Sequence, residues 1–213
     1  MRPSILLLAS ALAALPAAAQ TPRVTRAFEP ALTPWVGVRN FGDRATSVTS
    51  ARAGYGGSFT VGASFEAPMT RRTGFIVDLH LAPSAGQRLE NEAGVVSYDN
   101  ALGISLSALL AARLRPQAPV FFFAGGGVLA MTKKPIADAD GAAIEPMVDV
   151  GFGYDAVRVR EWNVRGIFHG YFLKPADPES PGFSAKGSAF DWSAGIGFRR
   201  TFGRTADATR SSR

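Results

Sequence analysis

Two histidines, His80 and His169, are the side chains in this sequence best suited to acid–base or nucleophilic chemistry. The chain contains no cysteine, which excludes disulfides, thiolate nucleophiles and cysteine-based metal sites. A hydrolytic histidine needs a nucleophile that it can deprotonate, but the neighbours of His169 are Phe168, Gly170 and Tyr171. His80 has no obvious nucleophile nearby either. We therefore interpret both as interior histidines bonded to neighbouring side chains, and we predict no catalytic residue.

Two other segments match ligand-binding motifs only in part. The run Asp138–Gly141 has the composition of a calcium loop, but Glu145 follows too soon for the EF-hand spacing. The triple glycine Gly125–Gly127 lacks the Gly-Lys-Ser/Thr ending of a phosphate-binding loop. Two further glycine pairs open no helix and indicate crowded inward positions, namely Gly151/Gly153 and Gly195/Gly197. The sequence thus predicts no cofactor-binding and no metal-binding residue.

The segments that must position these residues alternate apolar and polar side chains. From Trp162 to Phe172 the even positions are apolar or glycine, and the odd positions include Arg165 and His169. Phe190 to Phe202 alternates in the same way. A period of two indicates β-strands, and ten steps of about 3.3 Å at a tilt near 40° rise roughly 25 Å, the height of the apolar band of a membrane barrel.

The N-terminus has the pattern of a secretory signal peptide. Arg2 precedes the apolar run Ile5–Leu15, and small residues end the segment at Ala17–Ala19. We assign residues 1–19 to the signal peptide, with cleavage after Ala19. No later segment approaches the roughly 18 consecutive apolar residues of a spanning helix, so an exported chain that enters a membrane must do so as a closed barrel.

Eight alternating segments follow, joined by connections that are alternately long and short. The expected strands are Leu32–Phe41, Gly54–Glu66, Gly74–Leu81, Val95–Ala112, Pro119–Met131, Pro146–Val159, Trp162–Phe172 and Phe190–Phe202. The long loops are Gly42–Ala53, Ala82–Gly94, Thr132–Glu145 and Lys174–Ser188. This order predicts an all-β protein, an eight-stranded antiparallel up-and-down transmembrane β-barrel over residues 31–203, followed by a short flexible tail over residues 204–213. The orientation of Pro119–Met131, which is apolar on both faces, is left open.

The distribution of charge limits the classes of partner that the chain is expected to bind. The formal net charge is +6, or +5 once Arg2 leaves with the signal, and the basic residues are scattered. Scattered charge argues against nucleic acid and favours attraction to anionic lipopolysaccharide. Charged side chains of both signs are expected inside the barrel, where they must pair because isolated buried ions are costly. These are Glu66, Asp78, His80, Asp149, Asp155, Arg165, His169, Asp191 and Arg199.

On these features the chain resembles the small eight-stranded outer-membrane barrels of the OmpA/OmpX type. Members of that family end their last strand on an aromatic residue, and the run Ala194, Ile196, Phe198 and Phe202 is similar to that signal, although Arg200 interrupts it and eleven residues follow it. The resemblance implies insertion by the barrel-insertion machinery into the outer membrane of a Gram-negative cell. Expected partners are outer-membrane lipid and lipopolysaccharide, with an extracellular ligand bound through the loops.

A barrel of eight strands is filled by its own side chains, so we expect no pore and no enzyme but a scaffold that presents four external loops. Two alternatives stay open. A lipid A-modifying enzyme of the deacylase type would place a serine two residues after its histidine, where this chain has Tyr171. A soluble periplasmic ligand-binding barrel of the lipocalin type would turn Phe168, Trp192 and Ile196 inward instead of toward hydrocarbon.

Overall fold

The structure is a computed structural model that describes residues 28–116, 118–136, 141–159 and 162–202. The predicted signal peptide and tail lie outside the described residues. Within these ranges, no helix is long and apolar enough to cross a membrane. The described elements are strands: β1 (Ala31–Asn40), β2 (Asp43–Ser47), β3 (Arg52–Tyr55), β4 (Ser58–Pro68), β5 (Thr73–Asn91), β6 (Gly94–Ala112), β7 (Val120–Met131), β8 (Ala143–Val159), β9 (Trp162–Leu173), β10 (Phe183–Ala185) and β11 (Ala189–Thr201).

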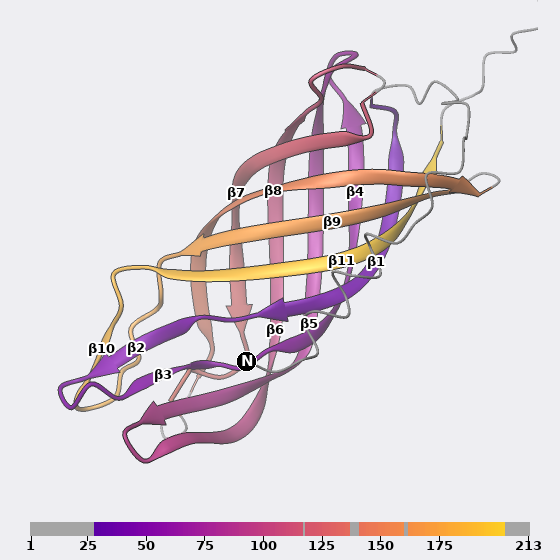
Figure 1. The fold of residues 1–213 in the computed structure, drawn as a ribbon. Helices are drawn as coiled ribbons and strands as arrows, with labels where there is room; N and C mark the ends of the chain where they lie inside the picture. The colour runs from indigo at the N-terminus through magenta and orange to yellow at the C-terminus, as the bar shows by residue number, and fades with distance from the viewer. Residues whose placement is uncertain (1–27, 117, 137–140, 160–161, 203–213) are drawn as a thin grey trace, which may run out of the picture.

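Eight of these strands close into a ring in the order β1-β4-β5-β6-β7-β8-β9-β11, because β1 pairs with both β4 and β11 (Figure 1). The paired residues give the shear of the ring. A path that starts at Leu32 in β1 and passes from each residue to its partner on the next strand reaches Phe190 in β11, and the β1–β11 register, continued beyond Asn40, places Phe190 opposite Gly42. The path therefore ends ten residues from its start (42 − 32), which is a shear of ten. Eight strands with this shear are tilted by about 40° and form a ring of roughly 8 Å backbone radius. The predicted eight-stranded antiparallel barrel is confirmed.

Alternation along each strand separates the barrel interior from its outer surface. In β7 the question left open by the sequence is settled, because Phe121 and Phe123 are buried inside whereas Phe122 is half exposed on the outer face. Inward glycines make room for these rings. A Cβ atom at Gly153 would lie 2.1 Å from the Phe121 ring, and one at Gly151 would lie 2.6 Å from the Phe123 ring. The prediction that these glycines face a crowded interior is confirmed.

The external connections contain more structure than the sequence predicted. The expected loop Gly42–Ala53 contains β2 and half of β3, the loop Lys174–Ser188 contains β10, and most of Ala82–Gly94 continues β5 as far as Asn91. Together with the outer part of β6, these strands form a sheet beyond the end of the barrel opposite the termini, which we call the extracellular sheet, in the order β10-β2-β3-β5-β6, at the lower left of Figure 1. The prediction missed this sheet because β2, β3 and β10 are short and consist mostly of polar and small residues, with no strict apolar alternation.

The position of Tyr55 also differs from the one that the sequence predicts. The expected strand Gly54–Glu66 would place Tyr55 on the same face as Phe59, but β3 and β4 are separate strands joined at Gly56 and Gly57. The break reverses the alternation, and Tyr55 is fully buried at the mouth of the barrel, where its hydroxyl donates to the Lys133 carbonyl oxygen at 2.6 Å.

Candidate functional site in the barrel interior

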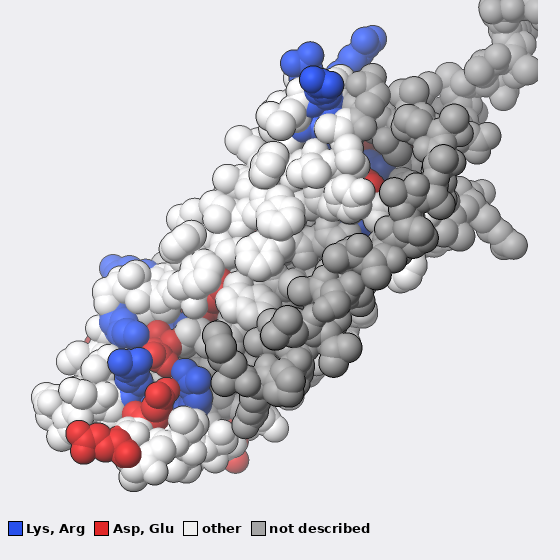
Figure 2. All heavy atoms as spheres, viewed as in Figure 1, with Lys and Arg blue, Asp and Glu red and all other residues white. Residues whose placement is uncertain are grey.

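The outer surface carries a continuous apolar belt. Figure 2 shows a band of uncharged atoms across the middle of the molecule, with Lys, Arg, Asp and Glu gathered toward its two ends. Large side chains from every strand of the ring contribute, among them Val36, Phe65, Leu79, Leu106, Phe122, Phe152, Phe172 and Ile196. On this face Phe152, Phe168 and Trp192 stack in a row across β8, β9 and β11, with centroid separations of 5.6 and 6.4 Å.

The inner surface is polar and charged. Arg165, Asp191 and Arg199 are buried inside the ring, as predicted, while Phe168 and Trp192 are partly exposed and Ile196 is exposed on the outside. Apolar side chains on the outside of a closed ring and ions on its inside require hydrocarbon around the ring. The chain is a transmembrane β-barrel. The predicted location in the outer membrane agrees with this surface, whereas the soluble lipocalin-type alternative requires the reverse.

One interior network fills the end of the barrel near the termini. Arg165 forms ion pairs with Glu66 and with Asp155, the latter at 2.6 Å. Arg199 contacts the other oxygen of Glu66 at 3.1 Å, and Arg113 reaches Asp155 at 2.6 Å. Each carboxylate therefore lies between two guanidinium groups, which is the pairing that buried charges need.

A second network closes the outer mouth. Arg44 in β2 donates from Nε to Glu145 at 2.8 Å and from both terminal nitrogens to Asp191 at 2.8 and 2.9 Å. Asp191 also accepts a hydrogen bond from Arg39 at 3.1 Å. Burial alone would lower the pKa of Arg44, but the two carboxylates outweigh it and hold the pKa above its ordinary value. Burial also raises the pKa of Tyr55, which packs beside this arginine, so that its hydroxyl stays protonated.

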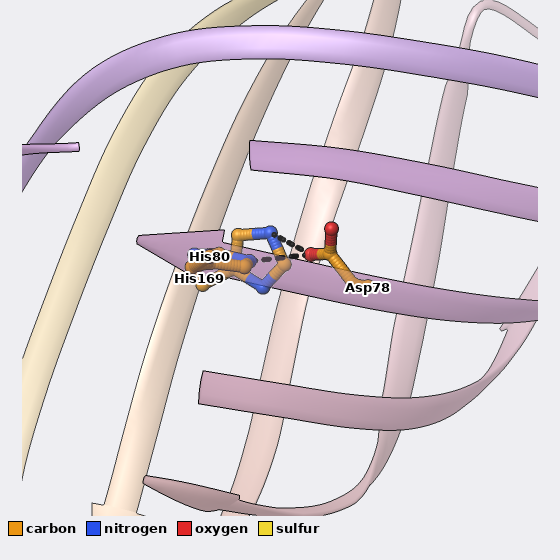
Figure 3. Close-up of side chains that lie close together, drawn as sticks. All are labelled: Asp78, His80 and His169. Atoms are coloured by element: carbon orange, nitrogen blue, oxygen red, sulfur yellow. Dashed lines mark hydrogen bonds and ion pairs between the residues drawn. The ribbon is translucent and has the colours of Figure 1, made fainter. Parts of the chain in front are cut away.

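A third group lies at the centre, between the two networks. Asp78 and His80 on β5 face His169 on β9, and all three side chains are buried (Figure 3). His80 Nε2 is 2.6 Å and His169 Nε2 is 3.3 Å from the same oxygen, Asp78 Oδ2. The other oxygen of Asp78 accepts hydrogen bonds from Ser64 Oγ at 2.9 Å and Trp35 Nε1 at 3.3 Å.

The second ring nitrogen of each imidazole, Nδ1, also has a hydrogen-bond partner. His169 Nδ1 is 3.0 Å from Asp149 Oδ1, and His80 Nδ1 is 3.0 Å from the Tyr171 hydroxyl. A cavity of about 10 Å³ lies beside the group and is lined in part by Asp78 and His169. This volume suits a single water molecule, far below the roughly 300–1,000 Å³ of a small-molecule site.

Comparison with known proteins identifies no family for this chain. No model of a protein family matches the sequence, and no curated protein matches it. Among solved structures, Neisserial surface protein A is 13% identical, with 82% of this chain and 100% of that chain covered at a TM-score of 0.43. The Ail protein of Yersinia pestis is 12% identical, covering 80% and 99% at 0.41, and the outer membrane protein AlkL is 12% identical, covering 91% and 99% at 0.45. A specific relationship to the OmpA/OmpX type stays a prediction.

All nine charged or histidine side chains expected inside the barrel lie there, and the structure divides them between the three groups. The prediction missed four polar partners, Arg39, Arg44, Arg113 and Glu145. Arg39 could have been found, because it shares the inward parity of Trp35 in β1. Arg44 and Glu145 could not, since both fall in segments that the sequence indicated as loops.

Proposed function

We propose that this chain is a non-enzymatic outer-membrane protein whose extracellular sheet binds a partner outside the cell. One observation carries the proposal: β5 continues ten residues beyond its last lipid-facing leucine, Leu81, and pairs there with β3 and β6. That is about 33 Å of strand, far more than a connection between two barrel strands needs.

The outer part of β6 offers the binding surface. All residues from 94 to 100 are exposed, and Val95, Val96 and Tyr98 are apolar. In the described part of the chain, β7 pairs with β6 only as far out as Gly103, so this stretch is an exposed edge. Such an edge can accept an added strand, with the apolar side chains giving specificity.

The non-enzymatic part of the proposal rests on the position of the histidines. A lipid A-modifying enzyme needs its catalytic group at the lipid surface, but His80 and His169 point into the ring and are almost fully buried. Lipopolysaccharide is proposed to surround the outer half of the belt. Insertion is proposed to use the exposed aromatic residues Phe198, in β11, and Phe202, directly after it.

The experiment displays the full chain on a cell that lacks other adhesins and measures binding to a panel of immobilised matrix proteins and polysaccharides. We expect at least one probe to bind, and we expect the double variant Val95→Asp, Tyr98→Asp to lose that binding. The matched control is Leu114→Asp, which is 78% exposed at the opposite end of the barrel and should bind normally. Equal binding by the two variants would overturn the role of the sheet, and altered lipid A in cells carrying the chain would overturn the non-enzymatic role.

A further inference from the structure

We propose that Asp78, His80 and His169 bind one divalent transition-metal ion, of the zinc class, inside the barrel. The three residues each offer one ligand atom, and these atoms all lie within 4.8 Å of one another. Two imidazole nitrogens converge on a single carboxylate oxygen, as Figure 3 shows. Nitrogen donors favour zinc and its neighbours over magnesium or calcium, which prefer oxygen.

An unpartnered atom points into this site. His169 Nε2 is buried and makes no hydrogen bond, although Asp78 Oδ2 lies 3.3 Å away. An Nδ1–H group that donates to Asp149 leaves a lone pair on Nε2, and that lone pair faces a carboxylate oxygen. Two electron-rich atoms in contact repel each other unless a cation lies between them.

The balance of charges in the barrel interior also calls for a cation at this site. At the mouth, Arg39 and Arg44 balance Asp191 and Glu145. In the described part of the chain, the ion pairs of Asp78 and Asp149 are all with histidine. Near the termini, and among the residues that the structure describes, Arg113, Arg165 and Arg199 share Glu66 and Asp155, so that network has one positive charge in excess. With neutral imidazoles the central group carries two negative charges, so the three groups together have one negative charge in excess, and it lies at the centre. A buried charge without a partner is strongly unfavourable. One divalent ion compensates the two negative charges of the central group.

The surrounding groups are those that a metal site uses. Metal-bound histidines usually place their second ring nitrogen against a carboxylate or another polar group, which fixes the ring. Asp149 does this for His169, and Tyr171 does it for His80. Both neutral hydrogen bonds to Asp78 go to Oδ1, which leaves Oδ2 available for the ion.

The dimensions also fit. In a tetrahedral zinc site two N and O ligands are about 3.4 Å apart, since each is about 2.1 Å from the metal. The His169–Asp78 separation is 3.3 Å, so that pair needs no movement. The His80–Asp78 pair, at 2.6 Å, opens by about 0.8 Å, and the two histidine nitrogens, which lie within 4.8 Å of each other, move to about 3.4 Å apart. A water in the adjacent cavity of about 10 Å³ supplies the fourth ligand.

The experiment uses the full chain without a histidine tag, refolded from urea into detergent with cobalt or zinc present, so that access to the interior cannot limit loading. After gel filtration we expect one metal per folded chain by elemental analysis and the visible absorption of tetrahedral cobalt. The heat-dependent gel shift of the barrel should move to higher temperature with metal. The variants His80→Gln and His169→Gln should each lose the metal and the cobalt spectrum.

Two further variants separate a metal site from a merely structural network. Asp149→Asn keeps all three ligands and should weaken binding about 10- to 100-fold. Glu145→Gln alters an interior carboxylate outside the site and should retain one metal per chain. The proposal is overturned if the folded full chain binds no metal, or if folded histidine variants bind as much as Glu145→Gln. In the first case, protonated histidines compensate the two aspartates.

Discussion

Arg44→Met should release the extracellular sheet from the barrel mouth while leaving the barrel closed. Arg44 is the side chain of β2 that enters the ring, and it makes four hydrogen bonds to the carboxylates of Glu145 and Asp191. Methionine preserves the length and much of the volume of the side chain but removes every donor. Asp191 keeps Arg39, whereas Glu145 loses its guanidinium partner.

The size of the destabilisation expected for Arg44→Met follows from the burial of the ion pair. The side chains of Arg44 and Glu145 are 0% and 1% exposed, so the carboxylate left behind gains little from water. Removing one partner of a buried ion pair costs about 3–5 kcal/mol. The four hydrogen bonds are not added to this figure, because they are part of the same interaction. The lost interaction makes local opening of β2 more favourable, because β2 is otherwise held only by short pairings with β3 and β10. Opening should become about 10²- to 4 × 10³-fold more frequent, since about 1.4 kcal/mol is a factor of ten.

Hydrogen–deuterium exchange of the detergent-solubilised chain, followed peptide by peptide, measures this opening. We expect faster exchange in β2, β3 and β10 and unchanged exchange in β4, β7 and β9. Arg52→Met is the matched control, because Arg52 lies in the same sheet but is exposed. The reasoning is refuted if exchange in β2 is unchanged, or if both variants accelerate it equally.

Three further predictions concern other parts of the molecule. Glu66→Gln leaves two buried arginines without their shared carboxylate and should lower barrel stability by about 3–5 kcal/mol, measured by urea titration of tryptophan fluorescence. Gly153→Ala places a Cβ atom 2.1 Å from the Phe121 ring and should destabilise the barrel by about 1–3 kcal/mol in the same titration, with no effect on the extracellular sheet. The Lys133 ammonium, 2.8 Å from Asp99, holds the pKa of that carboxyl below its ordinary 3.8, so the pair is intact above pH 3.8 and is lost as the pH falls through the lower folded value. Carbon NMR of the Asp99 carboxyl should give a midpoint below 3.8 that returns toward 3.8 in Lys133→Ala.

The sequence predicted those parts of the fold in which the surroundings of a residue decide its type. Lipid on one side and a packed interior on the other produce strict alternation, so the eight ring strands and the inward position of His169 followed directly. The strands of the extracellular sheet have water on one face and the closed mouth of the barrel on the other, where Arg44, Ala53 and Tyr55 are buried. Their residues are mostly polar or small and do not alternate with apolar ones, and for that reason β2, β10 and the first half of β3 were expected as loops.

Alternation tells which side of the wall a residue faces but not its height within the barrel, and the candidate site depends on height. His80 on β5 and His169 on β9 come from strands four places apart in a ring of eight, which are opposite walls. They meet because a ring of roughly 8 Å radius lets side chains from opposite walls touch, and because a shear of ten brings those two residues to one level. Moving His169 two positions along β9 keeps it inside the ring but shifts it by about 7 Å, which separates it from Asp78. The metal site therefore depends on the register of the whole ring, a property that no local segment of the sequence contains.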